Sequence, residues 1–329
     1  MDLQLLEQTM ADLGQPSYRA SQVWEWLAGG AETFDEMSNL PAGLRTALEA
    51  KLPISTLTVD ASAKSVDGTE KALFLTADRR PVEAVLMRYR DGRRSLCLSS
   101  QSGCPLTCTF CATGAMTFGR NLSESEILDQ ALHFRRIEPV NHTVFMGMGE
   151  PMMNLDNVLA VCERLPEVGI ANSHTTISTV GWLPGIQRVI TEGPAVRLAL
   201  SLHAPNDELR SKIMPINDRY PIAEVVGACR EWRHTRKRKV FIEYLMLDGV
   251  NDSRELAHEL AELLLPKNDF KVNLIPYNPS GSDYQGSSRE AIERFRTTLM
   301  NRGIHATVRL TRGRDIDAAC GQLAARAAA

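Results

Sequence analysis

Three cysteines stand close together in the stretch CLSSQSGCPLTCTFCATGAMTFGR, residues 97–120. Cys104, Cys108 and Cys111 follow a C-x3-C-x2-C spacing, and Cys97 lies shortly before them. Three thiolates on one loop can converge on a metal centre, but a structural zinc site normally has four ligands. A [4Fe–4S] cluster normally has four cysteines as well, one for each iron. A triplet therefore predicts a cluster with one iron open to a small-molecule ligand.

Two other interpretations of the triplet stay open at this point. Cys97 could be a fourth ligand and complete a zinc knot. The three residues could also be buried, inert cysteines, although the stretch contains Pro105, polar residues and a glycine, which are typical of a loop. Cys162 and Cys229 lie in helical patterns instead, and we expect both to pack in the core.

The composition limits the class of protein. The chain has 329 residues, of which 43% are hydrophobic and 23% charged, which fits one large globular domain plus a small one. Seven unevenly spread cysteines are unlike a secreted disulfide framework. The net charge of −3 does not indicate a general affinity for nucleic acid, so any RNA-binding site must be a local basic patch. Without a membrane-spanning run or a signal peptide, a cytoplasmic enzyme is expected.

The first part of the chain changes its pattern once. Residues 1–52 have apolar residues at helical spacing; one pattern stops at Gly29 and Gly30, and the next has Pro41 near its start. Residues 53–94 contain short β-like runs separated by Asp-Gly turns. We therefore predict a small N-terminal helical domain over 1–52 and a short β linker region over 53–94.

From residue 95 onward, strand and helix patterns alternate. The strand candidates are SLCLSS (95–100), NHTVFMGM (141–148), HTTISTV (174–180), AVRLALSLH (195–203), KVFIEYLML (239–247) and FKVNLIPYN (270–278). Repeated about six times, this alternation predicts an α/β fold with a parallel sheet and helical crossovers. Such units would form a partial, TIM-like (β/α)6 barrel over 95–313, short of the eight of a closed barrel.

Chemically suggestive residues follow several of these predicted strands. Cys104 comes after the first strand, and a Gly-Glu-Pro sequence comes after the second. Ser201 and His203 end a third strand, and Asn278 ends the last one. The C-terminal ends of parallel strands meet at one edge, which is where this fold class places its active site. We therefore expect these residues to surround one site.

The triplet and the sequence GMGEP at 147–151 together resemble the motifs of the radical S-adenosylmethionine (SAM) superfamily. In that superfamily the open iron of a [4Fe–4S] cluster is chelated by the amino and carboxylate groups of SAM, and an electron from the cluster cleaves the sulfonium to give a radical. The resemblance implies that Cys104, Cys108 and Cys111 are the cluster ligands. It also implies that Gly149 and Glu150 hold the amino group of SAM.

Further stretches resemble the RlmN/Cfr family of rRNA adenine methyltransferases over essentially the whole chain. They are YRASQVWEWL, FDEMSNLP, LALSLHAPND, VNLIPYNP and TRGRDIDAACGQLA. Pro151 favours the RlmN branch, because Cfr-type enzymes generally carry alanine there. The resemblance implies a radical SAM barrel, a helical domain that could contact RNA, and a C-terminal segment over 314–329 that carries a catalytic cysteine.

The resemblance also assigns roles to individual residues. Further SAM contacts would be Ser178, Ser201, Leu202, His203 and Asn278. Cys320 matches the cysteine that is methylated during catalysis, Cys97 matches a second catalytic cysteine, and Glu83 matches a proposed proton acceptor. Each residue has an ordinary alternative: strand-end polar residues, turn chemistry at Asn278, or a solvent-facing strand position for Glu83.

The implied reaction is methylation of adenine C2 in 23S rRNA at the peptidyl-transferase centre, and in tRNA next to the anticodon. One SAM would methylate Cys320, and a second SAM would yield the radical that links the S-methyl group to C2. Cys97 would then attack the sulfur of Cys320 and leave a disulfide, which requires Cα atoms within about 7 Å of each other. The implied partners are the two RNAs and a one-electron donor such as flavodoxin. The protein itself is expected to be a monomer that does not associate with a membrane.

Three alternatives and two possible RNA surfaces accompany this interpretation. The alternatives are a Cfr-type C8 methyltransferase, a zinc-binding RNA-binding module and a radical SAM activase of a protein glycine.

Two basic stretches could hold phosphates, although such runs are more often solvated faces. They are Arg88, Arg90, Arg93 and Arg94, and Arg233 with residues 236–239. Trp24 and Trp26 could also contact RNA, but they are expected to form the core of the helical domain.

Overall fold

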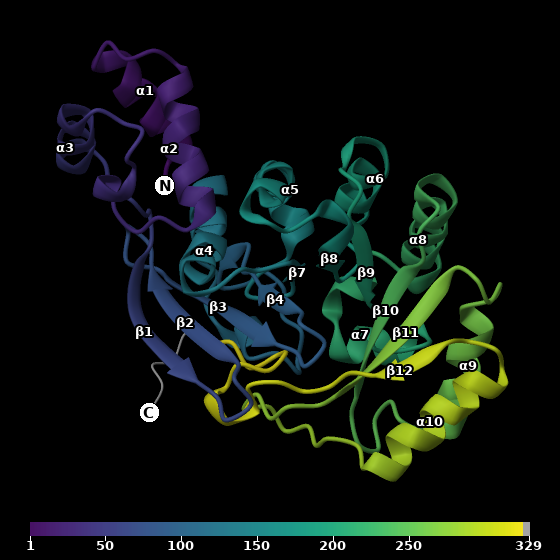
Figure 1. Cartoon of the computed structure of the whole chain (residues 1–329). Coiled ribbons are helices and arrows are strands. Elements are labelled where there is room, and N and C mark those ends of the chain that lie inside the picture. The colour runs from purple at the N-terminus through teal and green to yellow at the C-terminus, as the bar shows by residue number, and fades with distance from the viewer. Residues whose placement is uncertain (325–329) are drawn as a thin grey trace.

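The computed structural model describes residues 1–324 and contains a ten-stranded sheet with helices on its outer side (Figure 1). The strands lie in the order β1-β2-β3-β4-β7-β8-β9-β10-β11-β12. Their bounds are β1 Thr58–Lys64, β2 Glu70–Leu75, β3 Pro81–Arg88, β4 Arg94–Cys97, β7 His142–Phe145, β8 Thr175–Thr179, β9 Arg197–Ser201, β10 Val240–Met246, β11 Phe270–Pro276 and β12 Ala306–Val308. A separate pair, β5 Gln101–Ser102 and β6 Arg120–Asn121, closes the base of the cysteine loop.

The predicted α/β fold with a partial parallel barrel is confirmed. Each of the six predicted strands is present, and β4, β7, β8, β9, β10 and β11 pair in parallel with their neighbours in that order. The short strand β12 continues the parallel sheet beyond β11. The crossover helices are α4 Glu124–Ile137, α5 Leu155–Val168, α6 Leu183–Glu192, α7 Asp207–Ile213, α8 Ile222–Arg236, α9 Arg254–Leu263 and α10 Arg289–Asn301.

The local sequence explains why these elements form. Helix α4 begins at a capping box, in which the Ser123 side chain accepts from the Glu126 amide and the Glu126 side chain accepts from the Ser123 amide. Strand β8 is buried at all five positions of TTIST, as expected of a parallel strand covered on both faces. Cys162 and Cys229 have no exposed surface, which confirms their predicted place in the core.

The β region before the barrel is part of the same sheet. Strands β1, β2 and β3 pair antiparallel with one another, and β3 pairs antiparallel with β4, with Val85 opposite Cys97. Residues after β12 run back across the concave side of the sheet and reach this region, as Figure 1 shows in yellow. Two contacts fix that return: Lys71 Nζ lies 3.3 Å from the Asp317 carbonyl, and the Ala324 amide donates to Glu83 Oε2 at 2.9 Å.

The N-terminal residues form helices α1 Leu3–Asp12, α2 Tyr18–Gly29 and α3 Ala42–Lys51. Helix α2 ends as predicted, with Gly30 in the left-handed conformation at φ 107°. Trp24 is buried, and its indole N–H donates to Glu167 on α5, while Trp26 donates to Asn39 Oδ1 at 2.7 Å. The apolar side chains of this region belong to the same hydrophobic core as the barrel, so Trp24 anchors the helical part to the main body.

Within residues 1–324, none of the helices is both long and apolar enough to cross a lipid bilayer.

Candidate active site

A cavity opens at the carboxyl ends of the parallel strands, between the cysteine loop and the segment that follows β12. All the residues predicted for the site line this cavity, except Glu83 and Leu202. The lining set is Cys97, Cys104, Cys108, Cys111, Gly149, Glu150, Ser178, Ser201, His203, Asn278 and Cys320. Residues from both ends of the barrel sequence therefore meet at one place.

The cysteine triplet lies on the loop between β5 and β6. The Cys111 amide donates to the Cys108 carbonyl at 3.2 Å, and a Cβ at position 114 would lie 2.9 Å from that same carbonyl oxygen. Gly114 is therefore required for the close turn that brings Cys108 and Cys111 to one side of the loop. The loop also receives the C-terminal segment, because the Ala112 amide donates to the Gly321 carbonyl at 2.9 Å.

The three thiols fit a shared cluster. Burial raises the pKa of Cys104 to about 12, and it raises the pKa of Cys108 as well. Cys104 and Cys111 raise the pKa of Cys108 further, so the thiols are within electrostatic reach of one another. A bound metal centre would supply the positive charge that buried thiolates need. Among residues 1–324 no three His, Cys, Asp or Glu side chains converge on a single ion; a [4Fe–4S] cluster does not need that, because each cysteine binds a different iron.

Glu150 is held as a buried carboxylate beside the triplet. Its Oε1 accepts from the Met152 amide at 3.0 Å, and its Oε2 accepts from the Val180 amide at 2.9 Å. Burial raises the pKa of Glu150 to about 7, and these backbone donors oppose that rise. Gly149 has a φ of +95°, and a Cβ there would lie 2.5 Å from the Gln101 side chain. This close approach explains the glycine before Glu150.

The strand-end residues meet as predicted from their positions. Ser178 Oγ and Ser201 Oγ lie 3.4 Å apart across β8 and β9. His203 has a φ of 59°, and its Nδ1 accepts from the Leu245 amide at 3.0 Å. Burial lowers the pKa of His203 to about 3, so the imidazole is neutral and, with Nδ1 accepting, carries its proton on Nε2. Asn278 Nδ2 lies 3.4 Å from the Cys320 carbonyl, which ties the end of β11 to the C-terminal segment.

Sequence reasoning missed Arg210, a fully buried arginine on α7. Its Nε donates to the Leu202 carbonyl at 3.1 Å, and its Nη2 donates to the carbonyls of Val180 and Ser201. The guanidinium thus clamps the carboxyl ends of β8 and β9, where the serines and His203 lie. Leu202 itself packs its side chain in the core. No local spacing signals such a clamp, because its three acceptors come from two different strands.

Cys97 and Cys320 form a second pair of thiols in the cavity. Burial raises the pKa of Cys97 to about 12, and the nearby Cys320 raises it further. The Cys320 side chain lines the cavity and is exposed there. The protein groups around the cavity keep most water away from its thiol, and this desolvation raises the pKa of Cys320 too. The charge of Cys320 thus acts on Cys97, and that of Cys111, a member of the triplet, acts on Cys320.

Arg309, which was also missed, lines the cavity beside this pair. Its charge lowers the pKa of both Cys97 and Cys320. The guanidinium Nη1 lies 3.2 Å from Met146 Sδ and 3.5 Å from Glu243 Oε2. Arg309 is therefore a cation that can stabilise a thiolate at this pair. Its signal in the sequence is weak, because it follows a strand of only three residues.

Glu83 lies outside the cavity lining. It has no exposed surface on β3, so the expected alternative of a solvent-facing position is wrong. Its carboxylate lies 2.8 Å from Lys71 Nζ and accepts from the Ala324 amide. The C-terminal segment covers this face of the sheet, and a sequence pattern cannot show that. Glu83 therefore contacts the segment that carries Cys320.

The fold and this site define a radical SAM enzyme. The family model described as the radical SAM superfamily matches residues 98–261. Membership of that superfamily implies a [4Fe–4S] cluster and SAM, and the cysteines of segment 97–111 fit its motif. A second model, described as the ribosomal RNA large subunit methyltransferase N-terminal domain, matches residues 1–54.

The chain belongs to the RlmN family of radical SAM methyltransferases. It is 43% identical to a dual-specificity RNA methyltransferase RlmN of Pelobacter propionicus, over 98% of this chain and 94% of that protein. It is 45% identical to a probable dual-specificity RNA methyltransferase RlmN of Thermus thermophilus, over 97% of this chain and 92% of that protein. A crystal structure of a radical SAM methyltransferase from Sphaerobacter thermophilus matches with a TM-score of 0.93 and 43% identity, over 99% of this chain and 98% of that one.

Proposed function

We propose that this protein methylates C2 of adenine in 23S rRNA and in tRNA, through an S-methylcysteine on Cys320. The observation that carries the proposal is the meeting of Cys97 and Cys320 in the cavity that the cysteine triplet lines. The names of the relatives, dual-specificity RNA methyltransferases at 43% and 45% identity, support RNA as the substrate. They also support a place in the cytoplasm.

Adenine C2 requires this kind of site. It is an electrophilic carbon between two ring nitrogens, so an electrophilic methyl group cannot be transferred to it by simple displacement. When bound, the cluster and two molecules of SAM per turnover would supply two things: a methyl group for the Cys320 sulfur, and a radical that removes a hydrogen atom from that methyl group. A donor such as flavodoxin would provide the electron, and we propose that the protein works as a monomer.

The protein's own residues then have separate tasks. Cys320 accepts the methyl group at Sγ, loses a hydrogen atom from it, and forms the carbon–carbon bond to C2. Glu83 is the proposed acceptor of the C2 proton, although it lies outside the cavity lining and is paired with Lys71, so the base would have to reach it beneath the C-terminal segment. Once the adduct has lost the C2 proton and one electron, which the bound cluster would take back, the Cys97 thiolate attacks the Cys320 sulfur, as a thiolate attacks sulfur in thiol–disulfide exchange. The carbon attached to C2 leaves and takes a proton, which releases the methylated base and leaves a disulfide that must be reduced.

The SAM site follows from the buried groups around the triplet. The Glu150 carboxylate would bind an ammonium group, because two backbone amides already fix its orientation. The strand-end set clamped by Arg210 would orient the rest of the molecule. We propose the contacts Gly149, Ser178, Ser201, His203 and Asn278, while Leu202, which was predicted with them, packs its side chain in the core outside the cavity lining.

Product analysis tests the function. The protein, reconstituted anaerobically with iron and sulfide, is incubated with SAM, a reductant and rRNA or tRNA fragments, and the nucleosides are examined by mass spectrometry. We expect 2-methyladenosine in both RNAs, and charge-transfer absorption from the cluster. Formation of 8-methyladenosine would instead identify a Cfr-type enzyme, and a colourless zinc protein would contradict the radical mechanism altogether.

A pH prediction concerns Arg309. Its charge lowers the pKa of Cys97 and Cys320, so Arg309→Gln should raise both values. The thiolate is the reactive form, and each unit by which its pKa rises lowers the thiolate fraction about tenfold at a pH below the pKa. Alkylation of Cys320 in the cluster-loaded protein should therefore slow several-fold at a fixed pH, and its pH profile should move to higher pH.

Peptide mass spectrometry of iodoacetamide-treated protein measures that rate at Cys320 specifically. Arg309→Lys keeps the charge and should stay close to the unmodified protein. An unshifted profile in Arg309→Gln would show that Arg309 does not act on the thiols.

A further inference from the structure

An aromatic and cationic cluster lies at the rim of the cavity. Tyr89 follows β3, Arg93 lies in the turn before β4, and Arg312 follows β12. Both guanidinium groups lie over the Tyr89 ring, Arg93 at 4.3 Å and Arg312 at 5.2 Å from its centroid. Tyr89 and Arg312 line the cavity together with Leu310, which is 63% exposed. We call Tyr89, Arg93 and Arg312 the rim cluster.

Tyr89 and Arg312 of the rim cluster line the same cavity as the reacting thiols of Cys97 and Cys320. The Tyr89 hydroxyl is 3.7 Å from Met87 Sδ, another cavity-lining residue. Burial lowers the pKa of Arg309, but interactions with neighbouring groups raise it above its usual value. Tyr89 and Cys320 are both among the groups that raise it. A base that reached Cys320 would therefore pass close to the Tyr89 ring.

The structure separates the arginines of the first basic stretch. Arg88 and Arg94 both pair with Glu138, and Arg88 also pairs with Glu70 at 3.0 Å. Their charge is therefore neutralised beside the sheet. Arg93 pairs with the exposed Asp91 at 2.8 Å, an exposed ion pair of the kind that contributes little and that a phosphate can replace.

Arg312 has one carboxylate neighbour, Asp67 at 3.8 Å, and it also lies 3.4 Å from the Asp67 carbonyl oxygen. These contacts hold one edge of the guanidinium and leave its face over Tyr89. The Tyr89 ring thus holds two guanidinium groups at the edge of the cavity, and their planes can stack on a base while their charge contacts phosphate.

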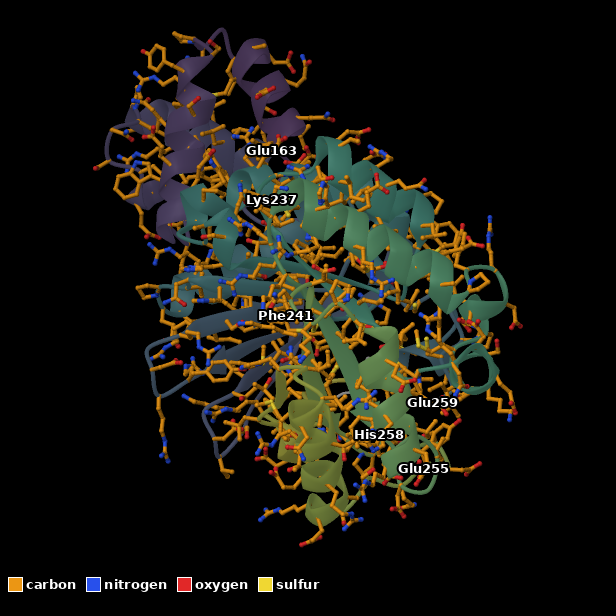
Figure 2. All side chains as sticks on the ribbon, turned by 90° about the vertical axis from the view of Figure 1, so that its right-hand side faces the viewer. Glu163, Lys237, Phe241, Glu255, His258 and Glu259 are labelled. Carbon is orange, nitrogen blue, oxygen red and sulfur yellow. The ribbon has the colours of Figure 1, made fainter. Side chains whose placement is uncertain are left out.

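The second basic stretch lies elsewhere. Lys237 precedes β10, whose opposite end carries the cavity-lining residue Leu245. Figure 2 shows Lys237 toward the helical side of the molecule, with Phe241 of β10 below it. Arg233 pairs with Asp269 at 3.8 Å, and Arg236 donates to the Val189 carbonyl at 2.8 Å. The second basic stretch is therefore farther from the cavity than the first.

We propose that the rim cluster binds the RNA nucleotides that flank the target adenine. This inference rests on the proposed function. An adenine must leave its stack to enter a buried site, and its neighbours then lose their stacking partner. Aromatic rings and arginine planes replace such a partner in RNA recognition, while the arginine charge contacts the phosphates. The exposed Leu310 adds apolar surface for the same bases.

The test compares RNA binding by matched variants of the cluster-loaded protein. The probe is a fluorescein-labelled rRNA fragment that the unmodified protein methylates, and anisotropy gives the Kd at several salt concentrations. We expect Tyr89→Ala to weaken binding about tenfold and Tyr89→Phe to bind normally, because the aromatic ring holds the two guanidinium groups that stack on the bases. Arg312→Ala should weaken binding and lower the salt dependence by the equivalent of about one phosphate contact.

Two controls separate this proposal from its foundation. Absorption of the bound cluster should be the same in Tyr89→Ala and Arg312→Ala as in the unmodified protein, which shows that the cluster-loaded protein has folded. Arg238→Ala, in the second basic stretch, should bind RNA normally. Binding within about twofold of normal in both rim variants, or an equal loss in Arg238→Ala, would overturn the rim cluster as the docking site. Failure of the unmodified protein to methylate any RNA would overturn the proposed function itself.

Discussion

Replacing Cys320 by alanine is expected to abolish RNA methylation without unfolding the protein. The Cys320 side chain is exposed to the cavity, so its removal leaves no packing defect. The backbone contacts of the segment are kept, including the Ala112 amide to the Gly321 carbonyl and the Thr113 hydroxyl to the Leu323 carbonyl at 2.6 Å. Because the proposed reaction first attaches the transferred carbon to this sulfur, we expect a loss of about a thousandfold or more, as for other covalent catalytic residues.

Quantification of 2-methyladenosine after a fixed time measures this loss, with cluster absorption recorded on the same sample. Cys162→Ala is the matched control, because Cys162 is a core cysteine far from the cavity lining and its loss should affect stability more than chemistry. A Cys320→Ala protein that kept full activity would point to another radical SAM reaction, such as activation of a protein glycine, in which this segment has no task.

The residues that could be predicted from the sequence are those fixed by local spacing. The triplet lies on one short loop, and Ser201, His203 and Asn278 end strands that run in parallel. Once the strands are recognised, the geometry of a parallel sheet brings such residues to one edge. This is why the predicted set lines a single cavity although it extends from Cys97 to Cys320.

The residues that could not be predicted act through contacts between distant segments. Arg210 clamps the carbonyls of two neighbouring strands, and Arg309 lies beside thiols on β4 and on the C-terminal segment. Tyr89 is an ordinary aromatic residue until Arg312, from the other end of the chain, lies over its ring. Glu83 is the one charged residue in the run VEAVLM, and the segment that covers it comes more than two hundred residues later.

The same reasoning explains the outcome for the β region. Short runs with period-two alternation indicate strands, but they do not show which strand they pair with. Residues 53–94 were expected to be a linker region, and in the structure β3 extends the barrel sheet by pairing with β4. This pairing places Val85 opposite Cys97 and packs Met148 and Leu323 against Val85. The β region therefore supports the C-terminal segment over the cavity.

Replacing Cys97 by alanine should have a different effect from the loss of Cys320: the reaction should stop after the RNA has been joined to the protein. In this variant Cys320 can still accept a methyl group and form the bond to adenine C2, but no second thiol can attack its sulfur. We expect a protein–RNA adduct that survives denaturation and approaches one RNA for each active site, with turnover of free product lost. Denaturing gel electrophoresis detects the adduct, and mass spectrometry after nuclease digestion locates it on the peptide that contains Cys320.

The double variant Cys97→Ala with Cys320→Ala is the matched control, and it should form no adduct. Release of free, fully methylated RNA by Cys97→Ala would remove Cys97 from the mechanism. The structure makes this a demanding test, because Cys97 ends β4 while Cys320 comes from the far end of the chain. Both thiols line one cavity with Arg309, whose charge lowers the pKa of each, and this arrangement supports the proposed attack of one sulfur on the other.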